Sequence, residues 1–206
     1  MRYLSIITNF GCSHRCPYCV TRNRHVLIDP ENDLSNLKEA MREAKPDIIS
    51  VSGGGDPLND YDKRRDWWAK LMEIIGGIPL EIHTSYLKND FDIPCERIVY
   101  HPVSKNEDIS LIKRKGSEKI RVVYVVTDDF TIDDLADLRL EAYANNSIDE
   151  FSYRQLVRRD GIASDHLERE LMIGHSQGWW HYIKQADYNI YFANGRLYNE
   201  FQRING

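Results

Sequence analysis

Strand-like and helix-like segments alternate along most of the chain, and this alternation constrains the fold more than any other feature. Repeated alternation of this kind predicts an α/β fold with a parallel sheet and right-handed crossovers. Because six strand–helix units are too few to close an eight-stranded barrel, we expect a (βα)6 partial TIM-like barrel, open at one side. Apolar and β-branched runs predict strands at 3–9, 47–52, 80–84, 97–101, 119–127 and 150–157. Helical spacing of apolar residues predicts helices at 33–41, 60–75, 107–113 and 132–144.

The pattern changes after residue 160. A helix is predicted near 165–173, and the pair Asn194-Gly195 between two alternating apolar segments predicts a β-hairpin. We therefore expect residues 1–160 to form the barrel. Residues 161–206 are expected to form a C-terminal extension, a helix and a β-hairpin, packed on the barrel within the same domain.

Length and composition describe an ordinary globular chain. It has 206 residues, 42% of them hydrophobic, which is enough to bury the core of one domain. Its formal net charge of −5 does not indicate a protein that grips a nucleic-acid backbone, since such proteins have a basic face. No apolar run approaches the roughly 20 residues of a membrane helix, and the first residues do not resemble a signal peptide. We expect a cytoplasmic protein with no membrane partner.

Three cysteines follow the first predicted strand in a C-x3-C-x2-C run, Cys12, Cys16 and Cys19. Iron–sulfur clusters are held by cysteine thiolates and normally take four, so three thiols suit a [4Fe–4S] cluster with one open iron. A structural zinc site is normally closed by a fourth ligand. A zinc knuckle and a dithiol redox loop remain alternatives. Cys95 has no partner cysteine, so we expect no second cluster and expect Cys95 to pack in the core.

The cysteine run, with an aromatic residue before its last cysteine, is followed later by Gly53-Gly54-Gly55-Asp56-Pro57. In this order the two motifs resemble the radical S-adenosylmethionine (radical SAM) superfamily. The resemblance implies that the three cysteines hold a [4Fe–4S] cluster and that SAM binds at its open iron. It also implies that a reductant, such as flavodoxin or ferredoxin, drives cleavage of SAM to a 5′-deoxyadenosyl radical. That radical takes a hydrogen atom from the substrate.

The resemblance also implies roles for individual residues. The second motif of the family usually reads Gly-Gly-Glu-Pro and receives the SAM amino group, so Gly54, Gly55 and Asp56 are expected there. Asp56 stands where Glu is usual and is one methylene shorter. Tyr18 is expected to lie against the adenine, although a tyrosine facing the core is the alternative. The cofactor contacts expected from the other strand ends are His83, Thr84, His101, Ser104, Val126 and Thr127.

Most of these residues follow the carboxyl ends of predicted strands, which meet at one rim of a parallel barrel. We therefore expect the cysteine loop, the glycine loop and the strand ends to converge there. His83 is equally consistent with a hydrogen-bonded histidine at a strand end that has no functional role. Arg22, Arg154 and Gln155 are candidate substrate contacts.

The sequence thus predicts a radical SAM enzyme that acts on a small molecule, such as a nucleoside-like or pterin-like compound. One alternative is an activase that installs a glycyl radical on a partner enzyme. A second alternative is a non-catalytic metal-binding module.

Overall fold

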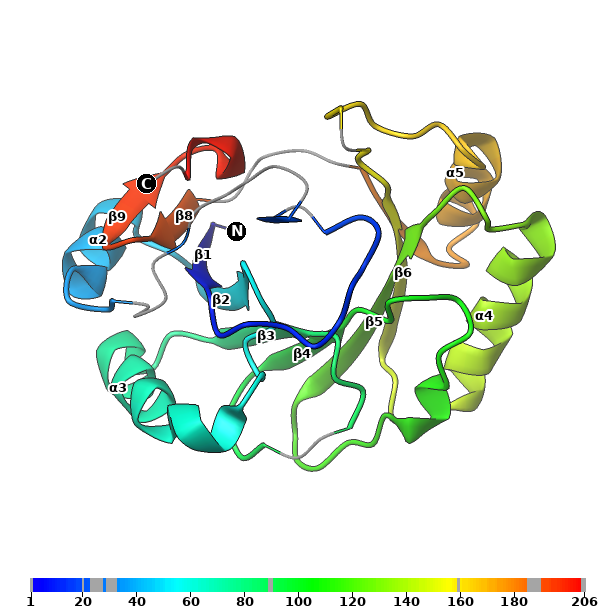
Figure 1. Ribbon diagram of the computed structural model, residues 1–206. Helices are drawn as coiled ribbons and strands as arrows, with labels where there is room; N and C mark the ends of the chain where they lie inside the picture. The colour runs from blue at the N-terminus through cyan, green and yellow to red at the C-terminus, as the bar shows by residue number, and fades with distance from the viewer. Residues whose placement is uncertain are drawn as a thin grey trace.

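The chain forms an α/β structure built on one mostly parallel sheet (Figure 1). The computed structural model describes residues 2–19, 21–22, 28, 33–88, 91–158, 160–184 and 190–204. Nine strands lie in the order β7-β6-β5-β4-β3-β2-β1-β8-β9. The two ends of this order, β7 and β9, are not paired with each other in the described residues, so the sheet is open rather than closed.

All six strands predicted from the sequence are present, although their ends differ by a few residues. The six are β1 (Tyr3–Thr8), β2 (Ile48–Gly53), β3 (Leu80–Thr84), β4 (Arg97–Tyr100), β5 (Lys119–Val126) and β6 (Glu150–Gln155). The other three strands are β7 (His181–Ile183), β8 (Ile190–Ala193) and β9 (Arg196–Tyr198). Four α-helices lie entirely within the described residues: α2 (Leu37–Ala44), α3 (Arg65–Ile75), α4 (Ile132–Ala144) and α5 (Glu168–Ser176). Short 3-10 turns occupy η1 (Tyr61–Arg64), η2 (Ile109–Leu111) and η3 (Phe201–Arg203).

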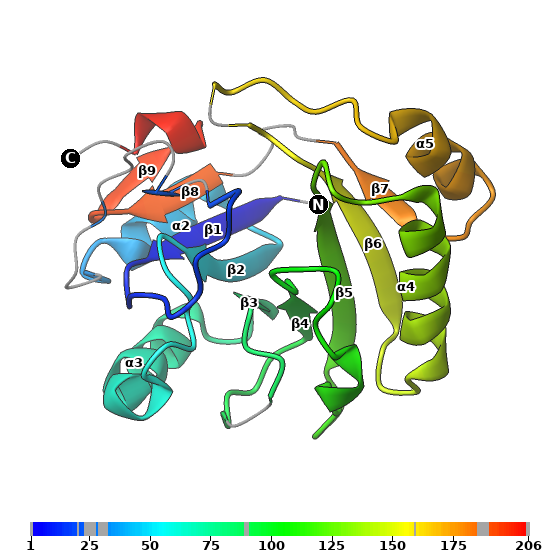
Figure 2. The same cartoon turned by 45° about the vertical axis from the view of Figure 1, so that its right-hand side comes forward.

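The helices lie on the convex side of the curved sheet, with α4 and α5 outside β5 to β7 (Figure 2). Alternate strand residues face these helices and form the main core, because successive side chains of a strand point to opposite faces. Ile82, Tyr100 and Val122 are fully buried in this core, together with Leu71 of α3 and Leu135 of α4. The other strand residues therefore face the concave side.

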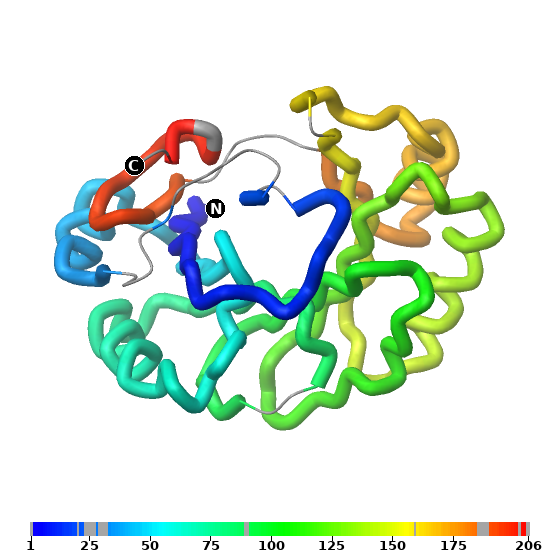
Figure 3. Tube along the Cα trace, in the orientation of Figure 1, coloured from blue at the N-terminus to red at the C-terminus, as the bar shows by residue number. Residues whose placement is uncertain are grey.

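The C-terminal segment extends the sheet at both edges. The expected helix and hairpin are present as α5 and β8–β9, and Asn194 and Gly195 at the turn have positive φ angles of 50° and 69°. The strand β7, which pairs in parallel with β6, was not predicted. At the other edge β8 pairs in parallel with β1, so the first and last segments lie side by side (Figure 3).

Helix α2 begins later than the periodicity predicts. Its first helical residue is Leu37, and the segment before it forms a turn in which the Asp33 carboxylate accepts hydrogen bonds from the N–H and hydroxyl of Ser35. Aspartate competes for nearby backbone N–H groups in this way, which favours a turn over a helix.

No helix among the described residues is long and apolar enough to cross a membrane.

Candidate functional site

The three cysteines lie on the loop that follows β1. All three thiols are free; Cys12 is exposed, and Cys16 and Cys19 are half-buried. A tight turn connects Cys16 and Cys19, in which the Cys19 N–H donates a hydrogen bond to the Cys16 carbonyl at 3.2 Å. The loop therefore presents three thiols within eight residues at the carboxyl edge of the sheet.

The thiols influence one another electrostatically. Burial first, and then the neighbouring Cys12 and Cys19, raise the pKa of Cys16 to about 11. Burial also raises the pKa of Cys12, with the charge of Asp56 adding to the effect. A bound cation reverses this situation, because coordination deprotonates a thiol outright. The donor set is thus chemically suited to a thiolate-bound metal group.

The thiols are not arranged as a finished metal site. Within the part of the chain that the structure describes, no group of three or more His, Cys, Asp or Glu side chains is placed to hold a metal ion. The loop supplies the donors in sequence, and metal binding would have to bring them to ligand distance.

Two contacts fasten the cysteine loop to neighbouring strand ends. The Tyr18 hydroxyl donates to the carbonyl of Pro102, just after β4, at 3.1 Å. The hydroxyls of Ser13 and Tyr86 lie 2.9 Å apart, which joins the loop to the exit of β3. Burial raises the pKa of Tyr18, and the charge of Cys16 raises it further. Tyr18 therefore acts as an anchor through its hydroxyl, and contact of its ring with adenine stays a prediction.

The glycine loop after β2 packs against the start of the cysteine loop. Gly54 donates to the Thr8 carbonyl at 2.7 Å, and the Asp56 N–H donates to the Gly11 carbonyl at 2.9 Å. A Cβ on Gly55 would lie 2.3 Å from that same Gly11 oxygen, and one on Gly54 would lie 3.0 Å from the Thr8 oxygen. Gly55 is required because two backbones meet there, and at Gly54 a Cβ would also lie 2.2 Å from the Ile28 side chain.

Asp56 is buried and joins the ends of β2 and β3. Its carboxylate accepts hydrogen bonds from the Ser85 N–H at 2.6 Å, the Thr84 hydroxyl at 2.8 Å and the Leu58 N–H at 3.0 Å. Burial raises its pKa, although these three donors oppose the shift. Asp56 and Thr84 thus hold two strand exits together. Direct contact of Asp56 with a ligand amino group stays a prediction.

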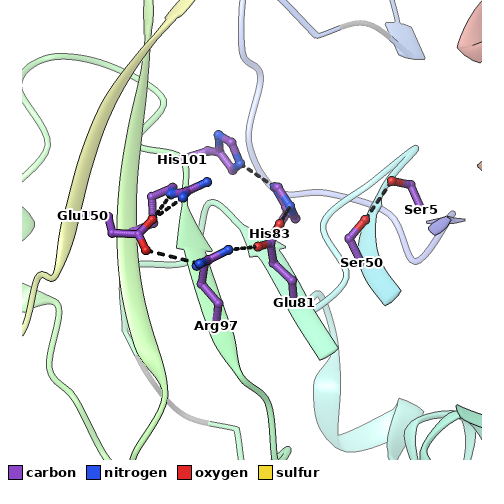
Figure 4. Close-up of polar contacts among 8 residues, drawn as sticks. Ser5, Ser50, Glu81, His83, Arg97, His101 and Glu150 are labelled. Atoms are coloured by element: carbon purple, nitrogen blue, oxygen red, sulfur yellow. Dashed lines mark hydrogen bonds and ion pairs between the residues drawn. The ribbon is translucent and has the colours of Figure 1, made fainter. Parts of the chain in front are cut away.

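The concave side of the sheet carries a connected set of charged residues (Figure 4). His101 Nε2 lies 2.9 Å from His83 Nδ1, and His83 Nε2 lies 2.8 Å from a carboxylate oxygen of Glu81. The other oxygen of Glu81 accepts from Arg97 at 2.7 Å. Although burial raises the pKa of Glu81, the hydrogen bonds and charges of His83 and Arg97 lower it to about 2.

The set continues across the next strands. Arg97 also donates to Glu150 at 3.2 Å, and Arg121 pairs with the other oxygen of Glu150. In the other direction along the same face, the hydroxyls of Ser5 and Ser50 form a buried 2.7 Å hydrogen bond. Strand register explains the alignment, because Ser5, Ser50, Glu81 and Arg97 are successive partners across β1 to β4. We call the following residues the concave polar row: Ser5, Ser50, Glu81, His83, Arg97, His101, Arg121, Glu150 and Arg154.

His83 and His101 are both half-buried. The pKa of His101 is held well below its usual value by burial first, and then by the positive charges of His83 and Arg154. The His83 side chain is 22% exposed. The two rings are nearly parallel, with centroids 5.2 Å apart.

The remaining predicted residues are more scattered. The Val126 side chain is buried in the main core, so only its backbone faces the rim. Thr127, at the end of β5, donates its hydroxyl to Asp129, and Ser104 is exposed on the loop after β4. Gln155 donates to the Ser164 carbonyl at 3.0 Å. Arg22 donates to the His14 carbonyl at 3.4 Å, which places it over the cysteine loop.

Sequence reasoning named His83, His101 and Arg154 but missed the groups that join them. Glu81 and Arg121 lie within β3 and β5 between apolar residues, as in Glu81-Ile82-His83, and Arg97 and Glu150 are the first residues of β4 and β6. That two-residue spacing is the signal that would have placed them on one face.

No protein-family model matches the chain, and no curated protein matches it.

Proposed function

We propose that the chain is a radical SAM enzyme whose sheet and helices form the partial barrel expected of that superfamily. The observation that carries the proposal is the position of the cysteine loop. It follows the first strand, presents three free thiols, and is fastened to the exits of β3 and β4. Ligand sites of parallel α/β sheets lie at this carboxyl edge.

In this proposal Cys12, Cys16 and Cys19 hold a [4Fe–4S] cluster. Three thiolates leave one iron without a protein ligand. When bound, the cluster and SAM together supply reductive cleavage of SAM and hydrogen-atom abstraction from the substrate. Electrons come from a reductant such as flavodoxin or ferredoxin.

The chain's own residues position and shield this chemistry. Tyr18 fixes the cysteine loop to Pro102, so that the loop does not swing away from the strand ends. Asp56 fixes the glycine loop to Thr84 and Ser85. With its carboxylate occupied by three protein donors, Asp56 would act chiefly by holding the glycine backbone beside which SAM would bind.

The concave polar row supports a small polar substrate. It places carboxylates, guanidinium groups and imidazoles on the face below the cysteine loop. Burying charges is costly, and paired charges add little net stability, so such a row is more useful for binding than for folding. This favours a small molecule over the protein substrate of a glycyl-radical activase.

Alanine substitution of each cysteine tests the proposal. Cys12→Ala, Cys16→Ala and Cys19→Ala each remove a cluster ligand and are expected to abolish SAM cleavage by the anaerobically reconstituted, reduced protein. Cys95→Ala is the matched control, because Cys95 packs beside the core and lies outside the loop. SAM cleavage that persists in the three loop variants, with iron still bound, would overturn the ligand assignment.

A further inference from the structure

When both rings are neutral, the histidine pair at the exits of β3 and β4 has a single hydrogen-bond direction. The Glu81 carboxylate only accepts, so His83 donates to it through Nε2–H. A neutral His83 then has its lone pair on Nδ1, and His101 must donate to it through Nε2–H. A neutral His101 has its own lone pair on Nδ1. Among the described residues, the only hydrogen bond to the His101 ring is the one with His83.

We infer that Glu81, His83 and His101 form a proton relay. A proton that arrives at His101 Nδ1 makes that ring a cation for a moment. His101 then passes its Nε2 proton to His83 Nδ1 and returns to the neutral state as the other tautomer. The positive charge remains on His83, where the Glu81 carboxylate lies 2.8 Å away. One proton binds at His101 Nδ1, the Nε2–H bond of His101 breaks, and an Nδ1–H bond of His83 forms. The step therefore needs no other reactant.

The surroundings favour charge on His83 rather than on His101. The charged groups of the concave polar row around the pair are Glu81 on β3, Arg97 on β4, Arg121 on β5, and Glu150 and Arg154 on β6. Arg97 and Arg121 are each paired with a carboxylate. The charges of Arg154 and Arg121 oppose protonation of His101, whereas Glu81 directly contacts His83.

The relay deepens the proposed function and rests on it for its purpose. The cysteine loop meets the chain at Pro102, the residue after His101. A substrate held beneath that loop would lie near the exit of β4, where His101 can accept a proton at Nδ1. The relay therefore suits a substrate with a hydroxyl or amine group that loses a proton during the reaction.

Nitrogen NMR of the full chain labelled with ¹⁵N-histidine tests the relay directly. The spectrum reports which ring nitrogen of each histidine is protonated. In the neutral pair both rings are expected to carry their protons on Nε2. As the pH falls, the first proton should appear as an imidazolium signal of His83, while the proton of His101 moves from Nε2 to Nδ1.

Glu81→Gln is expected to lower the proton affinity of the pair by roughly tenfold or more, because it removes the adjacent negative charge. Glu73→Gln, an exposed change on α3, should leave it unaltered. If Glu81→Gln does not fold, the tautomer exchange in the native chain decides alone. Independent titration of the two rings, or charge appearing first on His101, would overturn the relay. The measurement needs neither iron nor SAM, so its failure is distinct from failure of the proposed function.

Discussion

The carboxylate of Asp56 accepts a 2.6 Å hydrogen bond from the backbone N–H of Ser85, and this contact joins the loop after β2 to the loop after β3. Thr84 reinforces the junction, since its hydroxyl donates to Asp56 and accepts from the N–H of Tyr86. Two strand exits are thus held as one unit beneath the cysteine loop.

Thr84→Val should destabilise the fold by about 1–3 kcal/mol, because a buried carboxylate oxygen and the Tyr86 N–H each lose a partner. Urea unfolding measures the change. Thr127→Val is the control: among the described residues its hydroxyl bonds only to exposed Asp129, and we expect a change of less than about 0.5 kcal/mol. Equal effects of the two substitutions would show that the Asp56 junction is unimportant for stability.

Gly55→Ala should destabilise the protein by about 1–3 kcal/mol, because its Cβ would lie 2.3 Å from a backbone oxygen that cannot move alone. Gly77→Ala provides the comparison, as nothing lies within 4 Å of a Cβ there. Thermal unfolding of both variants checks the prediction. A Gly55→Ala protein as stable as the Gly77→Ala protein would mean that the two loops are not closely packed.

The buried Glu81 makes stability depend on pH in the acid range. Its pKa falls from an ordinary 4.5 to about 2 on folding, so its contribution is complete above 4.5 and is lost as the pH falls toward 2. A shift of this size corresponds to about 3 kcal/mol. Urea unfolding at several pH values should show this loss in the native protein.

The same titration in Glu81→Gln should show a smaller loss over that range, because no carboxylate remains to be protonated. Exposed Glu73→Gln serves as control and should keep the native profile. The account of the buried network fails if native and Glu81→Gln proteins lose stability in parallel between pH 4.5 and 2.

Tyr18→Phe removes the hydrogen bond to Pro102 and should cost about 0.5–1.5 kcal/mol of stability. Because this bond anchors the cysteine loop, we also expect the reconstituted variant to lose iron to a chelator faster than the native protein. Tyr143→Phe removes a hydroxyl that donates to the Trp179 carbonyl, far along the chain from the cysteines. Its iron loss should match the native rate, and accelerated loss in both variants would argue against a specific anchor.

Most of the strand–helix order could be predicted, because periodicity and β-branched runs are local properties. The helix expected at 107–113 is wrong, since only the 3-10 turn η2 forms there. The predicted hairpin at Asn194-Gly195 is confirmed for the same reason, since the turn residues themselves require positive φ. Strand β7 was missed because it is three residues long and too short to show alternation. Its place beside β6 depends on pairing, which the local sequence does not contain.

The candidate site likewise has features that the local sequence predicts and features that it does not. The cysteine and glycine motifs are contiguous and are visible in the sequence. The donors to Asp56, however, come from Thr84 and Ser85 on another strand, and the partners of Arg97 lie on β3 and β6. These contacts depend on register across the sheet. A polar residue at alternate positions of an apolar strand marks its face, but only the fold identifies its neighbour.

The most direct test of the central claim is made on anaerobically purified, reconstituted protein. Iron and sulfide are quantified first, and the reduced protein is then studied by electron paramagnetic resonance with and without SAM. We predict about four irons per chain, as a [4Fe–4S] cluster requires, and a spectrum that changes when SAM is added. Zinc in place of iron, or a cluster signal indifferent to SAM, would contradict the assignment of an open-site cluster.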